Sequence, residues 1–366
     1  IEKISKIMKI GNENDEVLKE KMFFFFISWV ENDSENREFI LPNFLKIIPL
    51  EELSHSFLIE NVLPHSLMTD FPECSKLLNN ALNKTYYASL SANSFSSSHS
   101  ASQLYCLGGF NENGTAISTV SKLNTTNKEW RSLPAMSKPK SAFGATVIDK
   151  KIFVCGGHTD KGKSKRLEVF DCERNTWADL ALMQSERTQF GMTTLNGDIF
   201  IAGGYEDSNE ISTVAKYFPQ TNTWTEIKTM NDKRNGLELI TLNGAIYAIG
   251  GENTKTVERY NPSTDEWSYV ASTHNPHFSF GATSHQNKIY VLSYNGFEVF
   301  DSQSNTWQEL PKLNVGEGTR LVSINNKLWA VGGEIIYEFD IFSNYWISRP
   351  YMDVVRHNHR AVVVDL

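Results

Sequence analysis

The sequence predicts a multidomain protein in which a small all-α domain precedes an all-β, six-bladed β-propeller. Three features recur together six times at a spacing of 39 to 48 residues: an aromatic residue, a glycine pair three positions later, and then a tryptophan. The first glycines are Gly108, Gly156, Gly203, Gly250 and Gly332, and Ser293 holds this slot in the fifth copy. The tryptophans are Trp130, Trp177, Trp224, Trp267, Trp307 and Trp346. Repeats of this period indicate an array of similar units.

Each copy has the pattern of four short strands. In the third copy we expect strands at 190–195, 198–202, 213–218 and 223–227. Asn196-Gly197 is a strong signal for a hairpin turn between the first two strands. The glycine pair suits a strand end with positive φ or close backbone approach, and the large rings can pack between neighbouring sheets. A four-stranded sheet repeated around an axis is a propeller blade.

The two ends of the repeat region predict how the ring closes. The first copy begins at Leu104 with its second strand, and it has no first strand of its own. The segment His359–Asp365 is a strand that no blade follows. We expect this strand to complete the first blade, because an unpaired edge would favour aggregation.

The repeat resembles the kelch repeat. The matching features are the aromatic-x-x-Gly-Gly motif, the strands VERYNP and EVFD, and the turns NTW and DEW, and together they cover about Gln103 to the end of the chain. The fifth copy departs from the pattern, since Ser293-Tyr294 replaces the glycines. This departure affects the expected geometry of that strand end and leaves the blade itself in place.

The first part of the chain predicts helices. Apolar residues recur at helical spacing in residues 16–31, and similar patterns follow in 37–48, 53–63 and 74–90. Beside the kelch repeats, residues 29–78 resemble the BACK domain of BTB-BACK-kelch proteins. The alternative is an unrelated helical cap. We expect a BACK-like domain over residues 1–88, a serine-rich linker over 89–103 and the propeller over 104–366.

The resemblance also implies a BTB domain ahead of the BACK domain. Residues 1–15 are too few and too polar to form one, so it is absent from this chain. The chain begins at Ile1, and we expect it to be a fragment or a processed product. A homodimer is expected only if an upstream BTB domain is present.

Composition excludes several classes of partner and location. The net charge is −8, and neither part of the chain carries the basic surface that nucleic-acid binding requires. The apolar run 22–30 is too short to cross a bilayer. The four cysteines have neither C-x-x-C spacing nor the density of a disulfide framework, which favours a reducing compartment. We therefore expect a cytoplasmic protein that binds neither nucleic acid nor membrane.

One aligned position predicts a binding surface. Five of the six residues there, sixteen positions before the glycine slot, are basic, and Gly316 is the exception; the closing strand supplies one of the five. The basic residues are Lys140, Arg187, Arg234, His277 and Arg356. Each precedes a first strand, so the symmetry places them around one rim. We expect them to contact an acidic or phosphorylated peptide segment; the alternative is that they brace adjacent blades or are solvated.

The sequence offers little support for catalysis. Cys106 and Cys155 lie at core positions just before the glycines, and the pair His357 and His359 lacks a third metal ligand. No glycine pair leads from a strand into a helix, as a phosphate-binding loop would require. We expect no catalytic residue, metal site or cofactor.

The resemblance implies a non-enzymatic function. In BTB-BACK-kelch proteins the propeller holds the substrate of a cullin-3 RING ubiquitin ligase, and the BTB domain supplies most of the cullin-3 contact. The alternative that some kelch proteins suggest is an actin-associated cytoskeletal scaffold.

Overall fold

The computed structural model describes helix α2 (Glu16–Glu31), ten single residues between 45 and 81, and residues 102–366 except 126, 208, 342 and 366. The chain divides into two compact units, Ile1–His99 and Ser100–Leu366. Helix α2 lies in the first unit and confirms the helix expected over residues 16–31. Its buried side chains are Phe23, Phe26, Ile27 and Val30, whereas Phe25 is exposed.

The rest of the BACK-like domain remains a prediction. Most residues of the helices expected over 37–48, 53–63 and 74–90, and nearly all of the linker, lie outside the described residues. In the part of the chain that the structure describes, α2 is the one helix with defined bounds. No described helix has the length and apolar character needed to span a bilayer.

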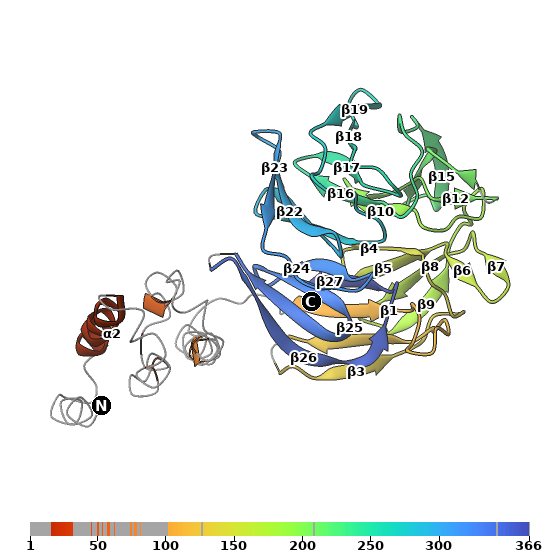
Figure 1. The fold of residues 1–366 in the computed structure, drawn as a ribbon. Helices are drawn as coiled ribbons and strands as arrows, with labels where there is room; N and C mark the ends of the chain where they lie inside the picture. Colours follow the sequence, from red (N-terminus) through yellow and green to blue (C-terminus); the bar gives the residue numbers. More distant parts are fainter. Residues whose placement is uncertain are drawn as a thin grey trace. The chain divides into compact units, whose positions relative to one another are not determined.

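The second unit is a six-bladed β-propeller (Figure 1). Blade 1 contains β27 (Arg360–Asp365), β1 (Ser102–Leu107), β2 (Val120–Asn124) and β3 (Trp130–Leu133). Blade 2 contains β4 (Gly144–Ile148), β5 (Lys151–Cys155), β8 (Leu167–Asp171) and β9 (Thr176–Asp179). Blade 3 contains β10 (Gly191–Leu195), β11 (Asp198–Ala202), β14 (Val214–Phe218) and β15 (Thr223–Ile227).

The second half of the ring repeats the arrangement. Blade 4 contains β16 (Glu238–Leu242), β17 (Ala245–Ile249), β18 (Val257–Asn261) and β19 (Glu266–Val270). Blade 5 contains β20 (Gly281–His285), β21 (Lys288–Ser293), β22 (Gly296–Asp301) and β23 (Thr306–Leu310). Blade 6 contains β24 (Arg320–Ile324), β25 (Lys327–Asp340) and β26 (Tyr345–Arg356), and the long β25 covers two strand positions of the other blades.

Two short hairpins extend the loops between second and third strands. In blade 2, β6 (His158–Thr159) pairs with β7 (Gly162–Lys163). In blade 3, β12 (Tyr205–Glu206) pairs with β13 (Asn209–Glu210). These loops lie at the same ends of the blades as the loops that enter each first strand, as the bridges Ser141–His158 and Thr188–Tyr205 show. We call this side of the propeller the loop face.

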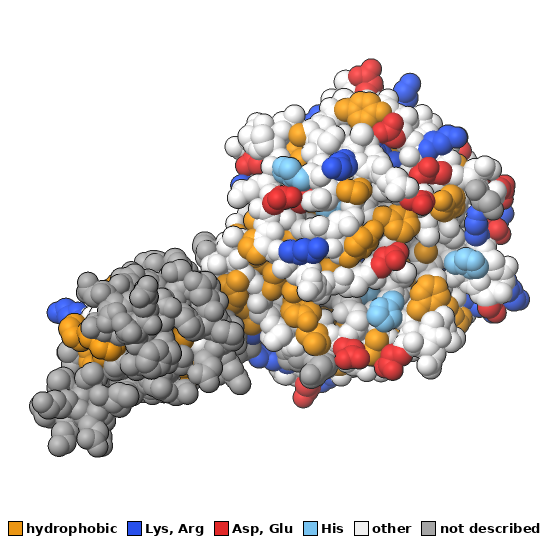
Figure 2. All heavy atoms as spheres, viewed as in Figure 1, with side chains coloured by type: hydrophobic (Ala, Val, Ile, Leu, Met, Phe, Trp, Pro, Cys, Tyr) orange, Lys and Arg blue, Asp and Glu red, His pale blue; other side chains and the backbone are white. Residues whose placement is uncertain are grey.

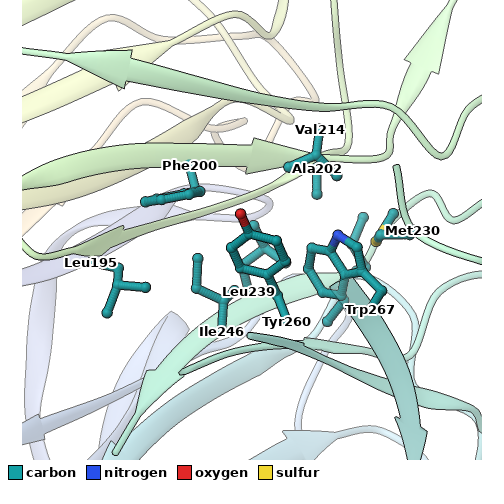
Figure 3. Packing of buried hydrophobic residues seen from close by; sticks show 11 residues of the cluster. Leu195, Phe200, Ala202, Val214, Met230, Leu239, Ile246, Tyr260 and Trp267 are labelled. Carbon is teal, nitrogen blue, oxygen red and sulfur yellow. The ribbon is translucent and has the colours of Figure 1, made fainter. Parts of the chain in front are cut away.

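Neighbouring blades share apolar cores built from the repeated aromatic residues. Between blades 3 and 4, Phe200 faces Tyr260 with their ring centroids 6.1 Å apart, and Tyr260 lies 5.1 Å from Trp267 (Figure 3). The indole nitrogen of Trp267 also donates to the carbonyl of Lys228, in the loop that enters the blade. The expectation that these rings pack between sheets is therefore confirmed.

The ring closes as the sequence predicts. Strand β27 pairs with β1 in an antiparallel register that places Leu104 opposite Val363 and Tyr105 opposite Val362. Val364 of β27 is buried in the apolar core that blades 1 and 2 share.

Deleting residues 357–366 should therefore destabilise the propeller strongly. The deletion removes β27, exposes the edge of β1 and opens the core around Val364, and we expect a loss of at least about 3 kcal/mol of unfolding free energy. Urea unfolding of the full chain checks this result. The control is Asp365→Ala, which removes only the exposed hydrogen bond from Ser102 and should leave the midpoint almost unchanged. An unchanged midpoint for the deletion would contradict closure by β27.

Candidate functional site

The five basic residues predicted to bind a partner are all buried. Their exposed fractions lie between 0 and 5%. Each lies in the loop that enters a different blade, or in the strand before it, and no hydrogen bond or ion pair joins two of them in the described part of the chain. The residues are Lys140, Arg187, Arg234, His277 and Arg356.

Arg234 has the most complete set of partners. Its guanidinium lies 3.0 Å from Oε1 of Glu258, on the third strand of blade 4, and both side chains are fully buried. Nη1 donates to the carbonyls of Gly250 and Thr256 at 2.8 and 2.7 Å. The carboxylate neutralises the buried charge, and the carbonyls satisfy the remaining donors, as burial requires. Arg234 thus ties the loop that enters blade 4 to two strand ends of that blade.

The same pairing occurs in blades 2 and 5 with different basic residues. Lys140 Nζ lies 2.5 Å from Glu168. In blade 5, His277 Nε2 lies 2.9 Å from Glu298, and Nδ1 lies 2.7 Å from the hydroxyl of Ser293. The departure of Ser293 from the glycine pattern has a local explanation, since imidazole is shorter than guanidinium and the hydroxyl of Ser293 reaches the ring nitrogen.

Among the described residues, Arg187 and Arg356 have no carboxylate partner. The third strand of their blades carries Ala215 and Ser121 where the others carry glutamate. Arg187 donates to the carbonyl and hydroxyl of Thr213. Arg356 donates to the hydroxyl of Ser121 at 2.9 Å and to two carbonyls. Burial lowers the pKa of both guanidinium groups, because removal from water disfavours the charged form.

The backbone of these residues contacts the preceding blade. In four glycine pairs the second glycine donates its N–H to the carbonyl of the basic residue that enters the next blade. The four bonds are Gly109 to Lys140 (3.0 Å), Gly157 to Arg187 (2.9 Å), Gly204 to Arg234 (2.7 Å) and Gly251 to His277 (2.9 Å). Each of these four basic residues therefore joins two blades, and we call this arrangement the blade clamp.

The clamp also explains the first glycine of the pair. Gly203 has a φ of +67°, and a Cβ there would lie 2.5 Å from the carbonyl oxygen of Arg234. Gly156 has a φ of +63°, and its Cβ would lie 2.6 Å from the carbonyl of Arg187. Glycine is required at both positions for two reasons: the φ angle is positive, and the neighbouring backbone leaves no room for a side chain.

These contacts favour the bracing alternative for the five basic residues, and their direct contact with a partner remains a prediction. Sequence reasoning missed the acidic half of the clamp. The signal was present, because Glu168, Glu258 and Glu298 occupy the second position of the matching strands LEVFD, VERYN and FEVFD. A search for acidic residues that recur in step with the basic ones would have found the pairs.

A second charged cluster lies on the propeller axis. Arg320 and Arg360 both donate to Oε1 of Glu238, and the Arg320 bond is 2.6 Å long. They also donate to the carbonyls of Phe280 and Phe143, so the cluster connects first strands from across the ring. Burial, followed by the nearby charge of Arg360, lowers the pKa of Arg320 to about 9. A channel of about 380 Å³ lined by the first strands lies beside this cluster.

Cys106, Cys155 and His359, three of the residues considered for chemistry, are buried, whereas His357 is exposed. Burial raises the pKa of Cys106 and of Cys155 to about 12, so both thiols stay protonated at neutral pH. His359 is fully buried, and burial lowers its pKa well below the usual value. Among the described residues, no group of three or more His, Cys, Asp and Glu side chains could hold a metal ion.

The loop face also carries lysines that form no ion pair with a described acidic residue. Beside the β6–β7 hairpin, Lys138, Lys161, Lys163 and Lys165 surround a hollow of about 410 Å³. Elsewhere, both signs of charge are interspersed over the propeller surface in view (Figure 2).

The first prediction from the clamp compares two arginines. Arg234→Ala should cost about 3–5 kcal/mol of unfolding free energy, because it leaves Glu258 buried and unpaired. Arg187→Ala should cost less, because no carboxylate loses its partner. Thermal or urea unfolding of both variants measures the difference, and the exposed Arg131→Ala is the control, expected to cost less than about 1 kcal/mol.

Partner capture with the same variants separates bracing from binding. A lowered midpoint with an unchanged set of captured partners would support the brace. An unchanged midpoint with lost partners would contradict it and favour direct contact.

The second prediction concerns the stability of the fold at low pH. Burial raises the pKa of Glu298, but hydrogen bonds from His277 and from the backbone and ring of His274 outweigh it and bring the pKa to about 2. An unfolded glutamate titrates near 4.5, so its ionised form stabilises the fold above that pH. This contribution, about 3 kcal/mol at most, should be lost as the pH falls from 4.5 towards 2.

Urea unfolding as a function of pH tests this contribution. The variant Glu298→Gln should lose less stability than the wild type over the interval, and the exposed Glu309→Gln should behave like the wild type. Parallel pH profiles for the wild type and Glu298→Gln would show that Glu298 does not carry the effect.

The repeat architecture is shared with known proteins. The KLHDC2/KLHL20/DRC7 Kelch-repeats domain matches residues 94–293. Kelch-like protein 41b of Danio rerio is 36% identical over 72 residues, which cover 20% of this chain and 12% of that protein. Kelch-like protein 28 of Mus musculus is 28% identical over 144 residues, or 38% of this chain and 25% of that protein.

Other relatives and one solved structure extend the comparison. The F-box/kelch-repeat protein At4g39560 of Arabidopsis thaliana is 39% identical over 77 residues, which cover 20% of this chain and 28% of that protein. The solved structure titled "Structure of YjhT" superposes with a TM-score of 0.56 at 14% identity, covers 69% of this chain and 97% of its own, and supports the fold alone. The matched segments span from about one eighth to about one quarter of the curated relatives. The domain match covers more than half of the chain, and this protein belongs to the kelch-repeat family.

Proposed function

We propose that the propeller is the substrate-recognition part of an adaptor for a cullin-3 RING ubiquitin ligase. Kelch propellers are generally protein-interaction domains, and two of the relatives described above are kelch-like proteins. The observation that supports the proposal best is the division of charge on the propeller. The basic residues of the clamps are buried and bind groups inside the blades. The lysines around the hollow on the loop face can still contact a partner.

The proposed mechanism is positioning without catalysis. The clamps fix the strand ends from which the loops emerge, so the loops are presented on a rigid scaffold. Binding would hold a lysine of the substrate near a ubiquitin donor on the ligase and raise its effective concentration there. No reacting group of the propeller is needed for this step, consistent with the inert positions of Cys106 and Cys155.

The proposal predicts that captured partners are ubiquitin-ligase substrates. We would capture partners with the chain in cells, remove the whole protein, and measure the lifetime of each partner with and without an inhibitor of cullin activation. We expect at least one partner to become longer-lived after either treatment, with no additive effect.

Partners with unchanged lifetimes, combined with co-sedimentation of the chain with actin filaments, would contradict the adaptor and favour the cytoskeletal scaffold. Partners that bind the chain after its loop face has been blocked by a fused domain would contradict recognition through these loops.

A further inference from the structure

The loops of blade 2 form a concave, positively charged site that the clamp does not use. The β6–β7 hairpin, the loop before β4 and the loop after β9 enclose the hollow of about 410 Å³. We call it the lysine cleft and define it by Lys138, Lys161, Lys163, Lys165 and Leu182. In Figure 1 the hairpin projects from blade 2 at the margin of the propeller.

The cationic groups of the cleft fall into two classes. Two of them form ion pairs with acidic side chains. Arg166 binds Asp179 through two bonds of 2.7 Å, and Lys140 binds Glu168 below the cleft. The other four are the ammonium groups of Lys138, Lys161, Lys163 and Lys165, and none of them forms an ion pair or a hydrogen bond with a described residue.

The acidic groups nearby do not balance these four charges. Glu186 lines the cleft and Asp160 lies in the hairpin turn, whereas Asp179 and Glu168 already have partners. Four free ammonium groups therefore face two free carboxylates. This excess occurs on a chain whose net charge is −8. Because the four charges repel one another, an anionic partner that enters the cleft gains free energy.

The backbone holds the lysines in place before any partner binds. The hairpin is bridged to the loop of Lys138 and Lys140 by two hydrogen bonds between His158 and Ser141, at 2.8 and 3.0 Å. Thr159 closes the hairpin turn with a bond of 2.9 Å to the carbonyl of Gly162, whose φ is +105°. A preorganised site loses less entropy on binding than a flexible loop would.

The shape and chemistry of the cleft identify the kind of ligand. Lysine ammonium groups are flexible point charges, which suit several separate carboxylates or a phosphate better than one bidentate contact. The side chain of Leu182 is 54% exposed at the margin of the cleft and offers an apolar contact. A hollow fits a protein segment better than it fits a membrane surface, which requires a flat or protruding basic patch.

We propose that the lysine cleft binds an acidic segment of the protein partner, with clustered carboxylates or a phosphorylated side chain at the lysines and an apolar side chain on Leu182. The proposal rests on the proposed partner-binding function and specifies its chemistry. It also assigns to blade 2 the acidic-segment binding that the sequence placed on the clamp residues.

The test measures binding of short labelled peptides to the full chain by fluorescence anisotropy. The probe alternates glutamate and aspartate around a central leucine; a second probe replaces two carboxylates by phosphoserine, and a neutral probe replaces all acidic residues by glutamine and asparagine. We expect the two anionic probes to bind, with an affinity that falls as salt is added, and the neutral probe not to bind.

Charge reversal locates the site. The double variant Lys161→Glu/Lys163→Glu should weaken binding of the anionic probes by about tenfold or more. The matched control is Lys150→Glu/Lys151→Glu, which makes the same charge change at the other end of β5 and should leave the affinity within about twofold of the wild type. Unfolding midpoints of both variants should stay close to the wild type, since none of the four lysines is buried.

Four results would overturn the proposal: no binding of either anionic probe, equal binding of the neutral probe, equal weakening by both variants, or preferential binding to vesicles of phosphatidylserine and phosphatidylcholine. A difference between the carboxylate and phosphoserine probes shows which anion the cleft prefers and supports the proposal in either case.

Partner capture with the same variants separates this proposal from the proposed function. If both variants retain all partners and their turnover, the cleft is not the binding site although the adaptor function stands. If the partners are lost only with Lys161→Glu/Lys163→Glu, both proposals are supported. Partners that depend on the cleft but have unchanged lifetimes would overturn the ligase role alone.

Discussion

The propeller depends on one repeated interaction, in which a buried basic residue is shared by two blades. Its side chain binds the blade that it enters, and its carbonyl accepts a hydrogen bond from the glycine pair of the blade before it. Apolar packing alone would let neighbouring sheets slide, because hydrophobic contacts have little directionality. The charge-assisted bonds fix the angle and distance between blades. Blade 6, whose entering loop carries Gly316 in place of a cation, is also the blade with register shifts between its outer strands.

The clamp separates the structural use of charge from its use in recognition. The basic residues buried in the clamps are paired with Glu168, Glu258 and Glu298 or with carbonyl groups, so they contribute little field at the surface. The lysines on the β6–β7 hairpin have no such compensation. The hairpin lysines can therefore be replaced during evolution without loss of the contacts that join the blades. This fits a rigid scaffold whose loops determine the partner.

Much of the fold could be predicted from the sequence because the repeat reports the same local structure six times. The closing strand, the strands of the third copy and the role of the aromatic rings are confirmed. The burial of Arg234 and of the four equivalent basic residues could not be predicted from the repeat pattern. Three of the five basic residues pair with a carboxylate some 20 to 30 residues further along the chain, and Arg187 and Arg356 pair with carbonyl and hydroxyl groups. These partners come together only in the folded blade. The pairing of Arg166 with Asp179 beside the hairpin lysines likewise appears only in the folded blade.

The pairing of β1 with β27 has a consequence for how the protein is made. Ser102 and Asp365, which face each other in blade 1, are separated by 263 residues, so the ring joins segments that leave the ribosome far apart in time. Blades 2 to 5 can form their own hairpins during synthesis, whereas β1 must wait for β27 with its edge unprotected. Contacts of such long separation form slowly, and an open edge attracts other chains. Until β27 has been synthesised, the edge of β1 is therefore open to strand exchange with other copies of the chain.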